Sequence, residues 1–196
     1  LIAQRVGPDV VQTTVVKGGE KEKGEKGPGR GQAAFRQLVF ELQQQDSPIV
    51  QAVDLLNPPG ELHALTPADN YRLILEPVQE RHVHVYQLTS SGSLVQIFPN
   101  PAYSPVPNPL GAGQLTTLPA EPNWLYLDGK PGEERMWVVA SPQPLRELDD
   151  LYAQYIQSPD AASKDELLSE LLNTLDTVAE THPERASAVE FVFLQR

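Results

Sequence analysis

A chain of 196 residues without cysteine cannot form disulfides, perform thiol catalysis or build cysteine-based zinc and iron–sulfur sites. Its net charge of −11 disfavours nucleic acid and anionic membrane surfaces as partners, because a phosphate-binding face needs clustered lysine and arginine. With 40% hydrophobic residues it can bury the core of one domain, and it holds no apolar run near the ~20 residues that a membrane-spanning helix needs.

The N-terminal part of the chain consists of one expected strand and one charged segment. Residues 10–16 are rich in β-branched side chains, which predicts a strand at the edge of a sheet. Residues 17–32 are mostly Gly, Glu and Lys, a composition typical of a flexible loop or linker. The alternative is a docking segment that orders against a partner and presents Lys21, Lys23 and Lys26.

The middle of the chain alternates apolar and polar residues, which predicts strands with one buried face. Such strands are expected over residues 33–42 and after residue 70, and residues 49–56 form a short apolar segment. Residues 82–86 and 94–100 flank a Ser-Ser-Gly-Ser turn and form an expected hairpin. The side chains expected on buried faces are Leu38, Phe40, Leu42, Tyr71, Leu73 and Leu75.

Residues 100–113 contain Pro101, Pro105, Pro107 and Pro109, which excludes a central strand and predicts an extended loop at the end of a sheet. Irregular loops on a rigid sheet often hold binding residues. We therefore expect Tyr103 and Pro105 on a surface that contacts a partner.

Residues 124–141 have the pattern of a strand, a polar turn and a second, largely apolar strand. Strong alternation on both sides of a Pro-Gly turn predicts a hairpin, and we expect this hairpin at the centre of the fold. Asp128, Glu134 and Arg135 lie in or beside the turn, and charge-assisted hydrogen bonds among such groups would lock it.

From residue 145 onward the apolar residues recur at helical spacing, and a closing strand follows over residues 188–194. One helix is expected from Leu145 to Ile156, and a second from near Ser163, with Glu166 completing a capping box. The second helix has an apolar stripe on one side, which we expect to cover the open face of the sheet rather than a partner.

Together these elements predict a mainly β (α+β) fold. We expect the whole chain, residues 1–196, to form a single domain: an antiparallel, sandwich-like β-rich core over residues 33–144, then two amphipathic helices and a last strand over residues 145–196.

Two groups of residues are candidates for chemistry. His82 and His84 lie two positions apart on a strand, as a metal site requires, but no third ligand is apparent and packing beside Tyr86 is the favoured interpretation. Asp128 and Glu134 are candidate acid and base residues of a hydrolase, although their clustering on one expected hairpin favours a structural role. No motif for a nucleophile, a phosphate loop or a cofactor is present.

Aromatic residues suggest a further kind of site. Trp124 and Tyr103 are candidates for a carbohydrate platform, together with Tyr126 and Trp137, although aromatic residues in strands more often belong to the core.

From about residue 65 to residue 151 the sequence resembles a bacterial family, domain of unknown function 4384. The matching features include Leu94 to Pro99 after Gly92, and Asn-Pro, Gly-Gln and Leu-Pro pairs between residues 108 and 119. Residues 124–141 resemble the signature of the family, which is carried here by Trp124, Leu127, Asp128, Gly132, Glu134, Arg135, Ala140 and Ser141. The resemblance implies an accessory module of exported or envelope proteins, and it implies no catalytic residues.

The sequence therefore predicts a non-catalytic protein-binding or assembly module without a cofactor, an accessory component of a bacterial envelope or secreted complex. We expect a periplasmic or extracellular location, which fits Leu1-Ile2-Ala3 as the end of a cleaved signal peptide. Other protein subunits are the expected partners. The alternatives are a carbohydrate-binding module and a hydrolase that uses Asp128 or Glu134.

Overall fold

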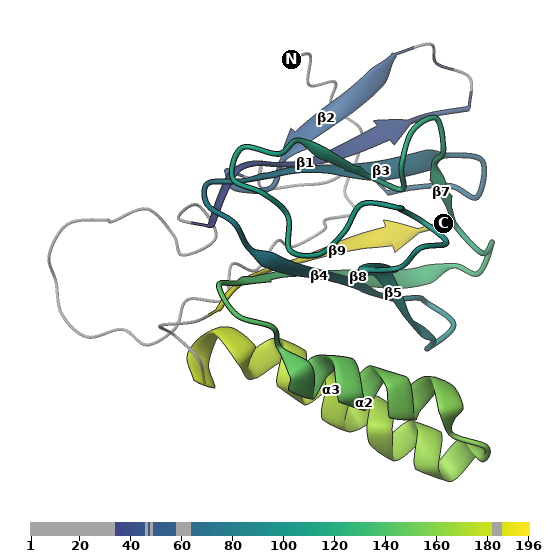
Figure 1. Ribbon diagram of the computed structural model, residues 1–196. Coiled ribbons are helices and arrows are strands. Elements are labelled where there is room, and N and C mark those ends of the chain that lie inside the picture. The colour runs from purple at the N-terminus through teal and green to yellow at the C-terminus, as the bar shows by residue number, and fades with distance from the viewer. Residues whose placement is uncertain (1–33, 46, 48, 58–63, 182–185) are drawn as a thin grey trace, which may run out of the picture.

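The computed structural model describes residues 34–45, 47, 49–57, 64–181 and 186–196 (Figure 1). The strand predicted over residues 10–16 and the loop predicted over residues 17–32 lie outside these described residues. The described strands are β1 (Phe35–Gln43), β2 (Val50–Asp54), β3 (Asn70–Pro77), β4 (His82–Leu88), β5 (Leu94–Phe98), β6 (Thr116–Leu118), β7 (Leu125–Tyr126), β8 (Gly132–Ser141) and β9 (Ser187–Gln195). The described helices are α2 (Arg146–Gln157) and α3 (Ala161–Thr181).

Two antiparallel sheets stack face to face. The first, sheet A, has the order β2-β1-β3-β6, with β7 also paired to β3, and the second, sheet B, has the order β5-β4-β8-β9. Figure 1 shows sheet A above sheet B, with both helices below sheet B. The structure thus confirms the mainly β, sandwich-like fold with two C-terminal helices and a closing strand.

The core between the sheets follows from the alternation in the sequence. Leu38, Phe40 and Leu42 of β1 all point into it, as predicted. The Phe40 ring lies 5.5 Å from that of Phe191 and 5.4 Å from that of Phe193, both on β9. Contacts between aromatic rings at these distances join the two sheets directly.

A second core lies between sheet B and the helices. Leu151 and Leu171, one from each helix, pack with Trp137 and Val139 of β8. The apolar stripe of the second helix therefore covers its own sheet, as expected. Within the described residues, no helix combines the length and the apolar character needed to span a bilayer.

Two details of the helices differ from the predictions. Ile156 is 55% exposed, because α2 turns Leu148, Leu151 and Tyr155 toward the sheet and Ile156 away from it. The expected Ser163 capping box is replaced by Asp160, whose carboxylate accepts hydrogen bonds from the backbone N–H and the hydroxyl of Ser163. An aspartate is an equally good cap for a helix N-terminus.

The hairpin predicted over residues 124–141 does not form. β7 pairs with β3 in sheet A, whereas β8 pairs with β4 and β9 in sheet B. The polar turn between them therefore carries the chain from one sheet to the other. Alternation fixes which residues of a strand face the core but not which strand is its neighbour, because both sheets bury one face against the same core.

Two further local predictions are confirmed. β4 and β5 pair as an antiparallel hairpin, and its turn contains Gly92 with a φ of 81°. The proline-rich residues between β5 and β6 form a loop, apart from one isolated bridge between Leu110 and Arg81.

We expect Leu171→Ala to lower the free energy of unfolding by about 2–5 kcal/mol, because it leaves a cavity in the core between sheet B and the helices. Leu171 is fully buried, whereas Ile156 is largely exposed. The control Ile156→Ala should change stability by no more than about 0.5 kcal/mol. Urea denaturation followed by circular dichroism measures both, and equal losses would contradict this orientation of the helices.

Candidate functional site

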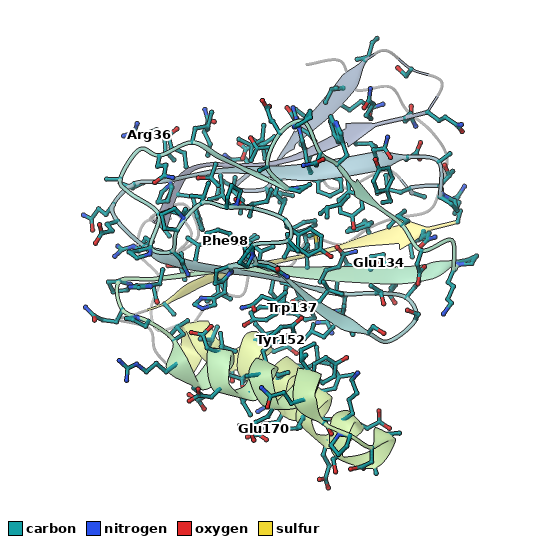
Figure 2. All side chains as sticks on the ribbon, turned by 45° about the vertical axis from the view of Figure 1, so that its right-hand side comes forward. Arg36, Phe98, Glu134, Trp137, Tyr152 and Glu170 are labelled. Carbon is teal, nitrogen blue, oxygen red and sulfur yellow. The ribbon has the colours of Figure 1, made fainter. Side chains whose placement is uncertain are left out.

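Glu134, the most buried carboxylate of the sequence signature, belongs to a hydrogen-bonded chain between the sheets. The Tyr71 hydroxyl donates to Gln87 Oε1 at 2.7 Å, and Gln87 Nε2 donates to Glu134 Oε2 at 2.8 Å. The other oxygen, Oε1, accepts from the Ser90 backbone N–H at 2.9 Å. Burial raises the pKa of Tyr71, so its hydroxyl stays a neutral donor. With both carboxylate oxygens engaged, Glu134 ties β8 to the end of β4 (Figure 2 labels this residue).

Arg135 lies on the opposite face of β8 and joins three elements. Its Nε donates to Glu190 Oε1 of β9 at 2.9 Å, and its Nη2 lies 3.6 Å from Asp176 Oδ1 of α3. The guanidinium stacks 4.8 Å from the Trp137 ring, and Trp137 Nε1 donates to the same Asp176 oxygen at 3.0 Å. Arg135 therefore holds the helix layer on sheet B.

Asp128 and Gly132 shape the turn that crosses between the sheets. Asp128 Oδ1 accepts from the Lys130 backbone N–H at 2.9 Å, and the Ser90 hydroxyl donates to the Lys130 carbonyl at 2.7 Å. Gly132 has a φ of 153°, and a Cβ there would lie 2.9 Å from Ser90 Cβ, so only glycine fits this contact.

The expectation that Asp128, Glu134 and Arg135 lock one hairpin together is therefore wrong. Each of the three has partners of its own. Asp128 holds the turn that crosses between the sheets, Glu134 belongs to the hydrogen bonds between the sheets, and Arg135 contacts the helix layer. In an extended strand, adjacent residues point to opposite faces, which separates Glu134 from Arg135.

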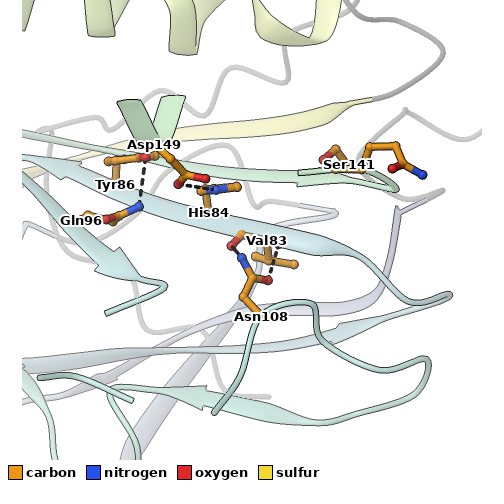
Figure 3. A network of polar contacts seen from close by, with 8 residues as sticks. Val83, His84, Tyr86, Gln96, Asn108, Ser141 and Asp149 are labelled. Carbon is orange, nitrogen blue, oxygen red and sulfur yellow. Dashed lines mark hydrogen bonds and ion pairs between the residues drawn. The ribbon is translucent and has the colours of Figure 1, made fainter. Parts of the chain in front are cut away.

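Of the two histidines, His84 lies against α2, where it contacts Asp149 (Figure 3). The buried His84 ring stacks parallel to Tyr86 with centroids 6.3 Å apart, so His84 packs beside Tyr86 as predicted, while the same interpretation of His82 stays a prediction. His84 Nε2 lies 3.1 Å from Asp149 Oδ1. Burial, and then the charge of His84, lower the pKa of His82. Among the described residues no three His, Cys, Asp or Glu side chains group as metal ligands.

The outer face of sheet A carries a surface that we call the outer-face patch, formed by Val50, Ala52, Arg72, Trp124 and Tyr126. Pairing aligns Tyr126 with Asn70, Asn70 with Gln43, and Gln43 with Val50, so these positions form one row across four strands. Arg72, Glu41 and Ala52 form the next row.

Arg72 is the centre of the outer-face patch. Its Nε donates to Glu41 Oε2 at 2.6 Å and its Nη1 to Glu121 Oε1 at 3.2 Å. The guanidinium lies 4.3 Å from the centre of the Trp124 ring. Tyr126 is 70% exposed. The ion pairs hold Arg72 in place over the tryptophan, so a cation, an indole and an exposed phenol lie on one face.

The expected partner residues are placed in different ways. Tyr103 packs against the core between the sheets and its carbonyl accepts from the Ala120 N–H at 2.7 Å, while Pro105 is exposed. Lys21, Lys23 and Lys26 lie outside the described residues. Tyr103 therefore does not share the outer face of sheet A with Trp124, as a common carbohydrate platform would require.

Sequence reasoning named Tyr126 among the platform candidates, but it did not single out Arg72 as a site residue. The signal for Tyr126 was present: in Trp-Leu-Tyr, residues 124–126, alternation puts both aromatic residues on the face opposite the buried Leu125. Nothing local in the sequence revealed the contact between Arg72 and Trp124, which lies 52 positions further along the chain.

We expect Glu134→Gln to destabilise the fold by about 1–3 kcal/mol, because the new amide group would place a donor against the Ser90 or Gln87 donor in a buried site. The exposed neighbour gives a matched control: Glu133→Gln should stay within about 0.5 kcal/mol of the parent. Thermal and urea unfolding measure both variants. A Glu134 variant as stable as the Glu133 variant would show that the buried hydrogen bonds from Tyr71 through Gln87 to Glu134 do not stabilise the fold.

Comparison with known proteins adds one finding. No curated protein and no solved structure matches the chain. Residues 69–144 match the model of a family described as Domain of unknown function (DUF4384), which confirms over that range the resemblance seen in the sequence.

Proposed function

We propose that this protein is a non-catalytic module that binds another protein through the outer-face patch. The observation that carries the proposal is the arrangement of Arg72, Trp124 and Tyr126, with Arg72 fixed by two carboxylates over the indole and Tyr126 exposed beside it. Tryptophan, tyrosine and arginine are the residues that most often dominate the energetics of protein interfaces.

The architecture supports this choice of face. Both described helices lie on sheet B, and no described helix lies on the outer face of sheet A (Figure 1). Exposed Val50 and Ala52 extend the patch with apolar surface toward the edge of the sheet. A partner would thus bury aromatic and apolar side chains around a cation that is already ordered, which reduces the entropic cost of binding.

The carboxylates support a non-catalytic role over a hydrolase. Glu134 is 1% exposed and both its oxygens accept hydrogen bonds, while Asp128 serves the turn at residue 130. A general acid or base must reach the proton that it transfers. We place the module in a bacterial envelope or secreted complex, an assignment for which the family resemblance is the support.

The test is site-specific photocrosslinking in the organism that encodes the chain. A photoreactive residue at position 126 should capture a protein that the same residue at position 170, on the far side of the helix layer, does not capture (Figure 2 labels Glu170). Once the captured partner is purified, Tyr126→Ala and Arg72→Ala should each weaken its binding by about 30-fold, the scale of an interface hot spot.

Glu170→Ala is the control on the opposite surface and should bind the partner like the parent. Equal capture from both positions, or full affinity in the Tyr126 variant, would contradict the proposal.

A carbohydrate-binding module is the second candidate, because an exposed tyrosine beside a tryptophan also offers a surface on which a sugar ring can stack. Arg72 already covers one face of the Trp124 ring, which leaves Tyr126 as the principal platform. Titration with soluble polysaccharides would favour this candidate if tryptophan fluorescence changed saturably and Tyr126→Ala abolished the change.

A further inference from the structure

The edges of the two sheets are treated differently by the fold. The edge strand β5 of sheet B directs the N–H groups of Leu94 and Gln96 outward, and both are occupied. The Tyr155 hydroxyl accepts from Leu94 N–H at 3.2 Å, and the Tyr152 hydroxyl accepts from Gln96 N–H at 2.9 Å. Asn100 Nδ2 donates to the Gln96 carbonyl at 2.8 Å. Helix α2 and the loop that follows β5 thus close this edge to any further strand.

Among the described residues, nothing covers the edge strand β2 of sheet A in this way. Leu55 N–H donates to the Leu38 carbonyl at 2.8 Å, which identifies residues 38 and 55 as a hydrogen-bonded pair of the antiparallel ladder. The two kinds of pair alternate, so Gln51 and Val53 also bond to β1 while Val50, Ala52 and Asp54 direct their N–H and C=O groups away from it. Among the described residues, no backbone group pairs with this outward row.

The side chains of β2 make this edge suitable for pairing. Val50 is 38% exposed and the preceding Ile49 is 63% exposed. The strand carries no lysine, arginine or proline, the residues with which natural proteins protect an exposed edge. Asp54 is its one charged residue, and Val53 packs at the margin of the core between the sheets.

We propose that the open edge of β2 takes an extended segment of a partner protein as an additional strand of sheet A. This inference rests on the proposed function and identifies how the partner would engage, because Val50 and Ala52 belong both to this edge and to the outer-face patch. The row of outward N–H and C=O groups is complementary to another extended backbone.

The chemistry of the partner segment follows from its surroundings. Its side chains on one face would lie beside Val53 and on the other beside Val50 and Ala52, so β-branched residues fit both faces. The net charge of −11 favours a segment with basic flanks and disfavours a second copy of this chain, which would bring the same charge.

The test uses the full chain and a fluorescein-labelled peptide, Lys-Thr-Val-Thr-Val-Thr-Val-Thr-Lys. In the chain alone, the amide hydrogens of Val50, Ala52 and Asp54 should exchange at least about ten-fold faster than those of Gln51 and Val53, as measured by nuclear magnetic resonance. Addition of the peptide should slow the three outward amides, and fluorescence anisotropy should show saturable binding.

Two controls isolate the edge. The same peptide N-methylated at each Val and Thr keeps its side chains but lacks the N–H groups, so it should not bind. Ala52→Lys should weaken binding of the unmodified peptide at least about ten-fold, because an edge lysine opposes strand addition. Thr117→Lys adds the same charge to the outer face at the other side of sheet A and should leave binding unchanged.

Four results would overturn the inference. Slow exchange of the outward amides in the chain alone would mean that the edge is already occupied. An exchange rate that does not depend on protein concentration would identify another segment of this chain as the occupant, and one that does would identify a second copy. Equal binding of the methylated peptide would exclude backbone pairing, and no binding of the unmodified peptide would exclude the edge as a site. If Tyr126→Ala weakens the natural partner while Ala52→Lys does not, the inference fails and the proposed function stands.

Discussion

The burial of β8 on both of its faces is the constraint on which the rest of the structure depends. Met136, Val138 and Ala140 point into the core between the sheets, whereas Trp137 and Val139 point into the second core, between sheet B and the helices. A strand with apolar residues at consecutive positions must be covered twice. Sheet A covers one side and the two helices cover the other, so the three-layer arrangement follows from this strand.

Two charged residues near the N-terminal end of β8 also point to opposite faces of the strand. Glu134 points toward the sandwich and completes the chain from Tyr71, while Arg135 points toward the helices and contacts Asp176 and Glu190. A buried carboxylate and a half-buried guanidinium are stable one residue apart because each has its own partners. This arrangement also explains why a run of acidic and basic residues in the sequence does not form a site: the strand separates its members onto two surfaces.

The sequence predicted the faces of the strands better than their neighbours. Alternation placed Leu38, Phe40 and Leu42 in the core, and helical spacing predicted the two helices, of which the second was expected to cover the sheet. These patterns depend only on local geometry. The pairing of β7 with β3 depends on contacts between residues about 55 positions apart, such as Tyr126 and Asn70, and no local pattern records such contacts.

The candidate surface was hidden from sequence reasoning for the same reason. Trp124 was recognised as a possible platform, but its ring contacts Arg72 and not Tyr103, because it lies on the outer face of sheet A and Tyr103 packs inward. Tyr126, two residues later, shares that outer face. Long-range pairing therefore decided which aromatic residues lie together.

The family match covers only part of the surface that we propose on sheet A. Residues 69–144 contain β3 to β8, so β1 and β2 of sheet A and β9 of sheet B are supplied from outside the match. Arg72, Trp124 and Tyr126 lie inside it, whereas Val50 and Ala52 lie outside. For a partner that contacts both groups, the matched segment would supply the aromatic centre of the surface and β2 would supply its apolar edge. The two parts are not independent, because Ala52 of β2 lies opposite Glu41, the carboxylate that holds Arg72 over the tryptophan.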